Sequence, residues 1–521
     1  MSATEEELIR SGPMTPQRAE LEGRTDVDFG PDCDTERGQI KLPAVLVPPC
    51  VEPFEGDNGG ATSPGVTADE IRIVYYQTDP ALDPLGAAMI GGVGADINPA
   101  SSQQLVEAYV DLYNQVFETY GRRVTVETFT GSGAADDRVA AKADAIAIAE
   151  RHPFAVVGGP AQATTAFGTE LATRGVICGP ICAGGGEDIL EEFAPYLWAV
   201  GPTPNQAAQL AAEMVGKLAG PGPATMAGDP ELQERDRAYG LVHYDTPEGE
   251  HRPVFEEFEA ALASNGVELA TDVEFFLDPA RMQDNARTIV NKLESAGVTT
   301  VIFYGDPLTP GALTTEATAQ GYHPEWILGP SVLADTTLFA RLTDGEQWSH
   351  GFGMSFVPAR GQREDSDAWK IYEWAYGEEP PNNTVAVLEA PLRLMFSGIH
   401  MAGPELTPGT FADGMYRAPV GGGGPTVPQF SMGEHGVWPT FDWGGIDDAA
   451  ILWWDPEATG EDEVGAEGQG MYRYANGGER YTIGEFPDSP EEAGLFDVGR
   501  SVTVYEDLPA DDQVPDYPPP G

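Results

Sequence analysis

Residues 153–183 constrain the fold of this chain more than any other stretch, because a strand, a helix and a second strand follow one another closely there. Residues 154–157 form the short apolar run of a strand buried on both faces, and a Gly-Gly-Pro sequence ends it. The pattern then predicts a helix over 163–173, which Gly175 ends, and a second strand from Val176. So short a connection predicts a right-handed parallel crossover, the building unit of an α/β sheet.

The ends of these two strands are the first candidate for a binding site. Open α/β sheets bind ligands beyond the carboxyl ends of their strands, where backbone N–H groups of the following helix point outward. On this basis the candidate residues are Gln162, Ala163 and Thr164, together with Ile181, Cys182 and Ala183 in the turn after the second strand. The alternative is that this unit is ordinary α/β scaffolding without a ligand.

Strands and helices alternate on both sides of this unit. Strands are predicted at 71–74, 124–129, 197–200, 239–243, 267–276, 300–304 and 326–328, and helices at 105–116, 136–150, 206–218, 253–265, 279–296, 313–320, 367–376 and 387–401. Near the end of the chain, an Asn-Gly turn at Asn476 predicts a hairpin between the strands MYRYA and ERYTI. Such alternation is typical of parallel sheets with helices on both faces.

Composition excludes several classes of partner. The chain has 521 residues, 41% of them hydrophobic, which is enough for two to four domains with large cores. Its 84 acidic and 28 basic residues give a formal charge of −56, which repels nucleic-acid phosphates and anionic lipid. We also expect no membrane span, since no stretch approaches the roughly 18–20 apolar residues required. The acidic first ten residues are unlike a leader, so we expect a leader or lipid anchor to be absent or already removed.

The four cysteines fall into two close pairs, Cys33 with Cys50 and Cys178 with Cys182. Three pairings are possible, and proximity along the chain favours the sequential one. A Cys33–Cys50 bridge would stabilise an otherwise coreless segment by roughly 3 kcal/mol and would suit a compartment outside a reducing cytosol. Between Cys178 and Cys182, a Gly-Pro turn permits the approach that a bridge requires. The alternative is four free buried thiols.

An enzyme is the main rival interpretation, and the sequence does not favour it. It contains no HExxH, no Walker loop, no GxSxG elbow and no GxGxxG after a strand. The seven histidines are scattered rather than spaced for a metal, and CGPIC is a single copy without a second cysteine pair. We therefore expect no catalytic residue, no metal and no cofactor.

An ordered set of motifs resembles the type 1 periplasmic binding proteins, the branched-chain amino-acid and amide class of ABC-importer receptors. The motifs are GVTADEIRIVYY, YGRRVTVE, FAVVGGPAQATTAFGTELATRGVICGP, YGLVHYD with FEEFEAALASNGVELATDVEFF, and VIFYG with ATAQGYHPEWILGP. The resemblance covers roughly residues 65–400. It implies an α/β fold of two Rossmann-like lobes of parallel sheet flanked by helices, joined by a hinge of several crossovers, that close on a solute.

The resemblance also implies a domain organisation. Lobe 1 would comprise 65–201 plus 329–430, and lobe 2 would comprise 202–328 plus 440–490. Residues 1–64 would be an extension and linker, and 491–521 an acidic, proline-rich tail in which we expect no packed structure. The hinge is expected near Gly201–Thr203 and near a second crossing at Gly329 and Pro330.

The family's amino-acid site is only partly matched. In the family's amino-acid binders, hydroxyl and backbone groups hold the ligand carboxylate, and an acidic side chain holds its ammonium. The hydroxyl positions correspond here to Gln162 and Ala183. Where the acid is expected the chain has Ser331, and Asp306 is the nearby acidic substitute.

A tyrosine of the family is also displaced at the start of the first helix of lobe 2, where Tyr244, Asp245 or Glu250 takes its place. Gln162 and Thr164 could bind a solute without charge, Ile181, Cys182 and Ala183 could form a small apolar wall, and Tyr244 and Tyr304 could stack on or cap the ligand. We therefore predict a neutral or weakly polar solute, such as an amide or a modest aromatic or aliphatic acid, rather than a free α-amino acid. The opposite outcome would follow if Asp306 held an ammonium group.

The expected partners are a small-molecule solute and, from the resemblance, an ABC permease. The expected location is extracytoplasmic, either periplasmic or at the cell surface. A ligand-sensing module of a signalling system has the same sequence features, and it remains the alternative to an import receptor.

Overall fold

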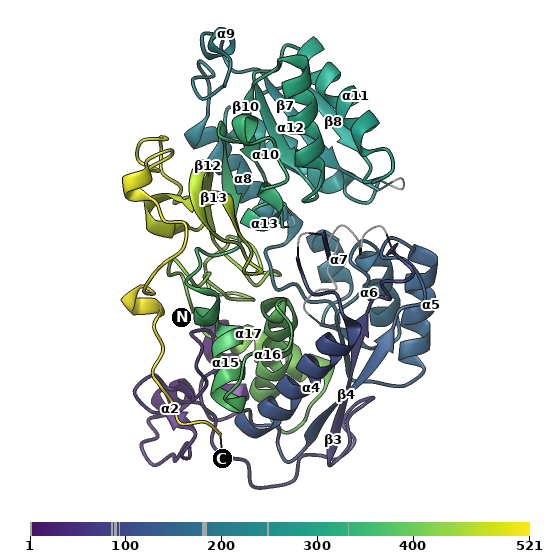
Figure 1. The fold of residues 1–521 in the computed structure, drawn as a ribbon. Helices are drawn as coiled ribbons and strands as arrows, with labels where there is room; N and C mark the ends of the chain where they lie inside the picture. The colour runs from purple at the N-terminus through teal and green to yellow at the C-terminus, as the bar shows by residue number, and fades with distance from the viewer. Residues whose placement is uncertain are drawn as a thin grey trace.

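The computed structural model describes residues 3–84, 87, 91, 92, 94–179, 185–246, 249–331 and 333–520, and it shows two lobes, each built around its own sheet (Figure 1). We call them the smaller lobe and the larger lobe, after the sizes of their sheets. Both sheets contain parallel strands with helices on their two faces. The predicted α/β fold class is therefore confirmed.

The smaller lobe, in the lower half of Figure 1, has a parallel sheet in the order β4-β3-β5-β6. Its strands are β3 (Glu70–Gln77), β4 (Arg123–Thr130), β5 (Ala155–Val157) and β6 (Ile177–Cys178). Its helices are α4 (Pro99–Val116), α5 (Arg138–Ala149), α6 (Thr164–Thr173), α7 (Glu187–Glu192), α15 (Asp367–Tyr376), α16 (Val385–Ala402) and α17 (Pro408–Arg417).

Alternation along β3 divides the smaller lobe into two cores. Ile71, Ile73 and Tyr75 point to one face, where they pack with α4, α15, α16 and α17. Val74 and Tyr76 point to the other face, where they pack with α5 and α6. This is the two-residue period of a strand covered on both sides.

The larger lobe has a sheet in the order β13-β12-β11-β10-β9-β7-β8, with β14 also paired to β12. Its strands are β7 (Tyr239–Tyr244), β8 (Leu269–Phe275), β9 (Thr300–Tyr304), β10 (Glu325–Leu328), β11 (Gly351–Ser355), β12 (Ala449–Glu461), β13 (Glu467–Tyr474) and β14 (Arg480–Tyr481). Its helices are α8 (Pro204–Leu218), α9 (Pro230–Gln233), α10 (Arg252–Ser264), α11 (Met282–Ser295), α12 (Thr309–Gln320), α13 (Thr337–Ala340) and α14 (Gly345–Trp348). The strands from β7 to β11 are parallel, whereas β12 runs antiparallel to β11, β13 and β14.

The chain returns to the smaller lobe later than the sequence suggested. We assigned 329–430 to the first lobe with a crossing near Gly329 and Pro330, but β11 pairs with β10 and extends the larger sheet. The return crossing therefore follows Ser355 and precedes α15. The first crossing does lie at the predicted position, directly before α8, where Thr203 and Gln206 form a capping box.

Between α17 and β12 the chain crosses for a third time, back to the larger lobe. This third crossing lies beside the first, because the Gly445 N–H donates to the Gly201 carbonyl at 3.0 Å. A buried pair of carboxyl groups, Asp442 and Asp447, holds this region together. Gln206 Nε2 donates to Asp442 Oδ1 at 2.6 Å, and Ser431 Oγ donates to Asp447 Oδ2 at 2.7 Å. Burial and the neighbouring Asp442 raise the pKa of Asp447 to about 9, so that the pair retains a proton at neutral pH.

The predicted hairpin around Asn476 is wrong. MYRYA belongs to β13, but β13 and β14 both pair with β12 and not with each other. β12 was not predicted, because its second half, DPEATGE, has the composition of a loop. The backbone at 476–478 adopts positive φ angles, as Asn-Gly sequences do, and it leads the chain across β12 instead of back along β13.

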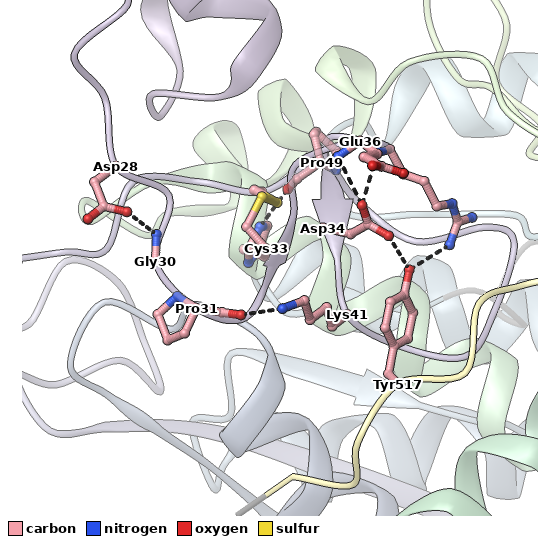
Figure 2. Close-up of a disulfide and its surroundings, with 12 residues drawn as sticks. Asp28, Gly30, Pro31, Cys33, Asp34, Glu36, Lys41, Pro49 and Tyr517 are labelled. Carbon is pink, nitrogen blue, oxygen red and sulfur yellow. Dashed lines mark hydrogen bonds between the residues drawn. A yellow bond between two sulfur atoms is a disulfide. The ribbon is translucent and has the colours of Figure 1, made fainter.

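The N-terminal segment, residues 3–64, is not coreless. It contains α1 (Ala3–Ser11), α2 (Pro16–Glu22), β1 (Cys33–Asp34) and β2 (Gln39–Ile40). Ile40, Leu42 and Ala44 are buried in the core of the smaller lobe. The predicted Cys33–Cys50 disulfide is confirmed, with 5.6 Å between the two Cα atoms (Figure 2). The second predicted bridge involves Cys182, which lies outside the described residues.

The C-terminal tail, residues 487–520, is also packed, contrary to expectation. It leaves the larger lobe and runs along the side of the molecule to the smaller lobe, where the yellow end of the ribbon lies (Figure 1). Thr426 donates through N and Oγ1 to Asp512 Oδ2, and Trp374 Nε1 donates to the Tyr517 carbonyl at 3.0 Å. The Tyr517 hydroxyl lies between Asp34 and Arg37, so the tail ends against the disulfide segment (Figure 2).

Among the described residues, α16 is the helix whose length and mean hydropathy would suit a membrane span. However, 56% of it is buried, and it packs against α4, α15 and α17. It therefore serves as a core helix of the smaller lobe.

Candidate ligand-binding site

The strand order of the smaller sheet reverses between β3 and β5. From β3 the chain passes through α4 to β4 on one side, whereas from β5 it passes through α6 to β6 on the other. Helices leave in opposite directions at such a point, which opens a crevice beyond the carboxyl ends of the two strands. A cavity of about 330 Å³ lies there, lined by Tyr75 and Gln77 from β3 and by Val157, Gly158 and Gly159 from β5 and its turn.

Most of the cavity wall is apolar. The first turns of α16 contribute Val387, Leu388 and Pro391, and Pro80 and Ile97 come from the segment between β3 and α4. Val387 keeps 60% of its surface exposed, which is unusual for a valine in a helix that otherwise packs in the core. A cavity of this size and lining suits the hydrocarbon part of a small organic molecule.

Few polar groups face the cavity. Burial raises the pKa of Tyr75 to about 12, so its ring carries a neutral hydroxyl. Gln77 Nε2 donates to Thr130 Oγ1 at 3.4 Å, while Gln77 Oε1 is buried without a partner. The turn at Gly158 requires glycine, because φ is +84° and a Cβ atom would lie 2.7 Å from the Tyr76 carbonyl oxygen.

The residues predicted from the first βαβ unit lie beside this cavity. The N–H groups of Gln162 and Ala163 both donate to the Ala135 carbonyl, and the Gln162 side chain is exposed. Thr164 is buried at the start of α6, whose N-terminus has no side-chain cap. Ala161, the residue before Gln162, and Ala135, which accepts these two hydrogen bonds, both line the cavity. They form the cavity rim next to the predicted residues. Ile181, Cys182 and Ala183 lie outside the described residues.

Across from this rim, Tyr244 ends β7 of the larger lobe. Its ring packs on His251 and Phe275, with ring centroids 5.4 and 6.2 Å away. Burial raises the pKa of Tyr244 to about 12, and the negative charges of four carboxylates contribute to this shift. These carboxylates are Asp306, Glu250, Asp245 and Asp136. Asp136 comes from the smaller lobe, so the strand ends of the two lobes face each other at Tyr244.

Asp245 and Asp306 differ in what remains available to a ligand. Asp306 Oδ1 accepts from the N–H groups of Leu308 and Thr309, and Oδ2 accepts from Thr309 Oγ1 at 2.7 Å. The Asp306 carboxylate is thus occupied at the start of α12. Asp245 Oδ1 accepts from the N–H groups of Thr246 and His251, but Asp245 Oδ2 is buried without a partner.

The remaining two predicted residues of the larger lobe have different surroundings. The ring of Tyr304 lies between Phe255 and Phe258, at 4.8 and 5.6 Å, and burial raises its pKa. It is mainly a core residue. Ser331, just after β10, has a buried hydroxyl without a partner.

An ion pair joins the two lobes at this position. Arg138, the first residue of α5 in the smaller lobe, contacts Glu250, which precedes α10 in the larger lobe. Glu250 was considered from the sequence, but Arg138 was missed, because nothing in the sequence around an exposed helix start indicates a partner in another lobe. The wall from α16 was missed for a related reason: an apolar helix predicts a core position, and its uncovered end becomes visible only in the fold.

Within the described residues, no group of three or more histidine, cysteine, aspartate or glutamate side chains could hold a metal ion. The arrangement offers instead an apolar hollow on one lobe and a tyrosine with carboxylates on the other. Such an arrangement can bind an organic molecule by burying its hydrocarbon part and hydrogen-bonding its polar part.

Comparisons with known proteins agree with this geometry. A family model described as periplasmic binding protein matches residues 88–439, which is more than half of the chain. A search of curated proteins found no match. Among solved structures, a periplasmic binding protein from Burkholderia mallei has a TM-score of 0.55 at 12% identity, covering 82% of this chain and 99% of that one.

Two further solved structures have the same fold. The fatty acid ABC transporter substrate-binding protein from Thermomonospora curvata has a TM-score of 0.53 at 14% identity, covering 82% of this chain and 96% of that one. A solute-binding protein of an ABC transporter from Rhodopseudomonas palustris HaA2, in complex with p-hydroxybenzoic acid, has a TM-score of 0.53 at 12% identity, covering 81% and 98%. The chain therefore belongs to the periplasmic binding protein family, in the type 1 class that its sequence resembles, and it is a solute-binding receptor.

Proposed function

We propose that this receptor captures a small organic solute between its two lobes, outside the cytoplasm, and delivers it to an ABC permease. The observation that carries the proposal is the 330 Å³ apolar cavity at the β3/β5 reversal, placed opposite the strand ends of the larger lobe. The permease is inferred from membership of the family, whose members serve ABC transporters.

The proposed site has a part in each lobe. In the smaller lobe, Tyr75, Gln77 and Leu388 would surround the hydrocarbon part of the solute. In the larger lobe, Tyr244 and Asp245 would face its polar part, with Ser331 as a further hydrogen-bonding group. Closure would bring the two parts together, and the Arg138–Glu250 ion pair would favour the closed form.

The lack of a free cationic partner among the described lining residues supports the prediction that the solute is not a free α-amino acid. A zwitterion would need one partner for its ammonium and another for its carboxylate, because burying an unpaired charge costs on the order of several kcal/mol. For the carboxylate, the described cavity lining contributes no lysine or arginine, and Arg138 is already paired with Glu250. Asp306, the residue considered as the ammonium partner, already accepts three hydrogen bonds from its own turn.

The disulfide supports the proposed location. The two cysteines of the Cys33–Cys50 bridge are buried, and disulfides persist in oxidising compartments. We also propose that the chain is a receptor without catalytic activity. This proposal is supported by the family to which the chain belongs, which consists of substrate-binding proteins.

The test combines a solute library with a measurement of shape. A ligand at 100 times its Kd stabilises the folded state by about 2.7 kcal/mol, which raises Tm by a few degrees in a chain of this size. We expect at least one small organic solute to do so and to reduce the radius of gyration measured by X-ray scattering. If a broad library gives neither a thermal shift nor a more compact shape, the proposed function is wrong.

A further inference from the structure

The polar surroundings of Tyr244 indicate which kind of head group the solute carries. Four carboxylates act on the Tyr244 hydroxyl: Asp136 from the smaller lobe, and Asp245, Glu250 and Asp306 from the larger lobe. We call these four residues the acidic rim. Arg138 is the cation that contacts the rim, through Glu250, and His251 is kept neutral there because burial lowers its pKa. Among the described residues, Arg138 pairs with one carboxylate of the rim and Arg252 pairs with Glu274 outside it, so the rim carries a negative charge.

The start of α5 connects the cavity edge with the rim, because Arg138 of this segment contacts Glu250. Ala135 lines the cavity, and the next residue along the chain is Asp136. The described lining contributes no lysine or arginine, and its ionisable acidic residue is Asp83. A solute whose hydrocarbon part fills the cavity would therefore direct its polar end toward carboxylates.

One rim oxygen lacks a partner that a ligand could supply. Asp245 has no exposed surface, and its Oδ1 accepts two backbone hydrogen bonds, but its Oδ2 accepts none. A buried carboxylate oxygen without a donor is unfavourable, so a ligand N–H placed there would gain a charge-assisted hydrogen bond. Ser331 Oγ and Gln77 Oε1 are likewise buried without partners, and both can accept from a donor.

A carboxylate head group would be repelled at this position and would find no free anchor. It would face the negative rim, and its natural anchor, the start of α6, is partly occupied because the N–H groups of Gln162 and Ala163 donate to the Ala135 carbonyl. The Arg138 guanidinium is already paired with Glu250. Like charges at such separations repel, whereas an ammonium group would be attracted.

From these contacts, and building on the proposed function, we propose that the solute is an organic amine: its apolar body occupies the cavity and its N–H donors bind the acidic rim at Asp245. A primary amide, which also donates N–H groups, is the next best head group, and a carboxylate is the least favoured. The formal charge of −56 on the whole chain would in addition speed the arrival of a cationic solute.

The experiment compares head groups on a constant body. Binding to the full chain is measured by calorimetry and thermal shift for hexylamine, hexanamide and hexanoate, and for benzylamine, benzamide and benzoate. We expect the amine to bind tightest in each set and the carboxylate weakest. Asp245→Asn keeps Oδ1 as an acceptor but replaces the charge, and it should weaken amine binding roughly tenfold.

Two further variants control for folding and for net charge. Asp136→Asn alters an exposed side chain, so folding is preserved, and it should weaken amine binding by about two- to fivefold. Glu268→Gln removes one exposed charge away from the rim and should leave binding unchanged. The inference is overturned if a carboxylate binds tightest in its set, or if Asp245→Asn and Glu268→Gln behave alike.

The outcome separates the inference from the proposed function. If none of the six compounds binds but another compound of the library does, the head group of that compound tests the inference. A carboxylate or a zwitterion would contradict the inference, while the receptor function would stand. If no compound binds at all, the proposed function fails and the inference fails with it.

Discussion

The two sides of the cleft have opposite chemical character. The smaller lobe presents an apolar hollow formed by Tyr75, Val157 and the start of α16, whereas the larger lobe presents Tyr244 with Asp245, Glu250 and Asp306. Both sides consist of residues at the carboxyl ends of parallel strands, so the sheets alone do not explain the difference. The segments that follow the strands decide whether a strand end leaves space for a ligand or fills it.

After β3 the chain takes residues 78–98 to reach α4, and the end of β3 lines the cavity. After β9 the chain turns at once into α12, and Asp306 is consumed in stabilising that turn. The comparison suggests that the hollow of the smaller lobe provides affinity through burial of apolar surface, while the larger lobe provides selectivity through charge.

The largest effect is expected from the disulfide, which would show whether the two lobes also differ in stability. Replacing Cys33 and Cys50 together by alanine should lower the free energy of unfolding by roughly 3 kcal/mol, because the bridge closes a loop with a sequence separation of 17. Since Ile40 and Leu42 of this loop pack in the smaller lobe, hydrogen exchange should accelerate there first. Equal acceleration in both lobes would contradict a separate role for the N-terminal segment.

Filling the hollow should abolish the contribution of the smaller lobe to binding. Ala161 is exposed on the cavity rim, so Ala161→Trp should fold normally and place an indole in a space of about 330 Å³. We expect affinity for the solute identified by the library to fall at least hundredfold, about 2.8 kcal/mol, as measured by calorimetry. Val139→Trp, at a position with 81% of its surface exposed on α5, is the matched control. Undiminished binding by Ala161→Trp would place the solute elsewhere.

Raising the pH tests the region between the two lobes. The pKa of Asp447 is raised from 3.8 to about 9, so in this interval the folded state holds a proton that the unfolded state has lost. The stability contributed by this proton is fully present below the unfolded pKa and is lost as pH rises toward 9, by at most about 1.4 kcal/mol per pH unit. Tm measured from pH 7 to 9 should therefore fall more steeply in the natural chain than in Asp447→Asn.

Asp284→Asn serves as the control for this pH series, because its side chain is 79% exposed. It should retain the steep fall of the natural chain. A pH dependence that is the same in all three proteins would mean that Asp442 and Asp447 do not share a proton.

The smallest effect is expected from the ion pair that joins the two sides of the cleft. Glu250→Gln removes the charge that meets Arg138, and both side chains are partly exposed, so the loss should be below about 1 kcal/mol. Solute affinity should fall a few-fold and the radius of gyration without solute should rise. An Arg138→Gln, Glu250→Gln double variant that matches either single variant would confirm that the two residues act as a pair, and simple additivity would contradict it.

Much of the fold could be predicted from the sequence, because apolar runs of four to eight residues bounded by glycine and proline mark the parallel strands well. The failures have physical reasons. β11, with the sequence GFGMS, uses glycine where a Cβ at Gly353 would lie 2.2 Å from the Leu328 carbonyl oxygen, and such glycines weaken the strand pattern. In β12 the sequence DPEATGE contains an irregularity in pairing between Asp455 and Thr459, and its composition is that of a loop.

The site was less predictable than the fold. The strand ends could be located from the sequence, and Tyr244 and Asp245 lie where the larger lobe would contact the proposed ligand. The hydrogen bonds of Asp306 within the turn before α12 could not be foreseen, because the same Asp-x-x-Thr pattern serves either a turn or a ligand. Arg138 and the α16 wall come from segments far apart in the sequence, and their roles depend on how the lobes and helices are packed.

Hydrogen exchange with and without bound solute is the most direct test of the central claim that the solute contacts both lobes. With the best solute of the library at saturation, the account predicts slower exchange in two separate regions: residues 75–78 with 157–161 in the smaller lobe, and residues 244–246 with 249–251 in the larger lobe. The core of each sheet should change little, because it is already protected. Protection confined to one lobe, or spread evenly over both lobes without these two regions standing out, would contradict the account.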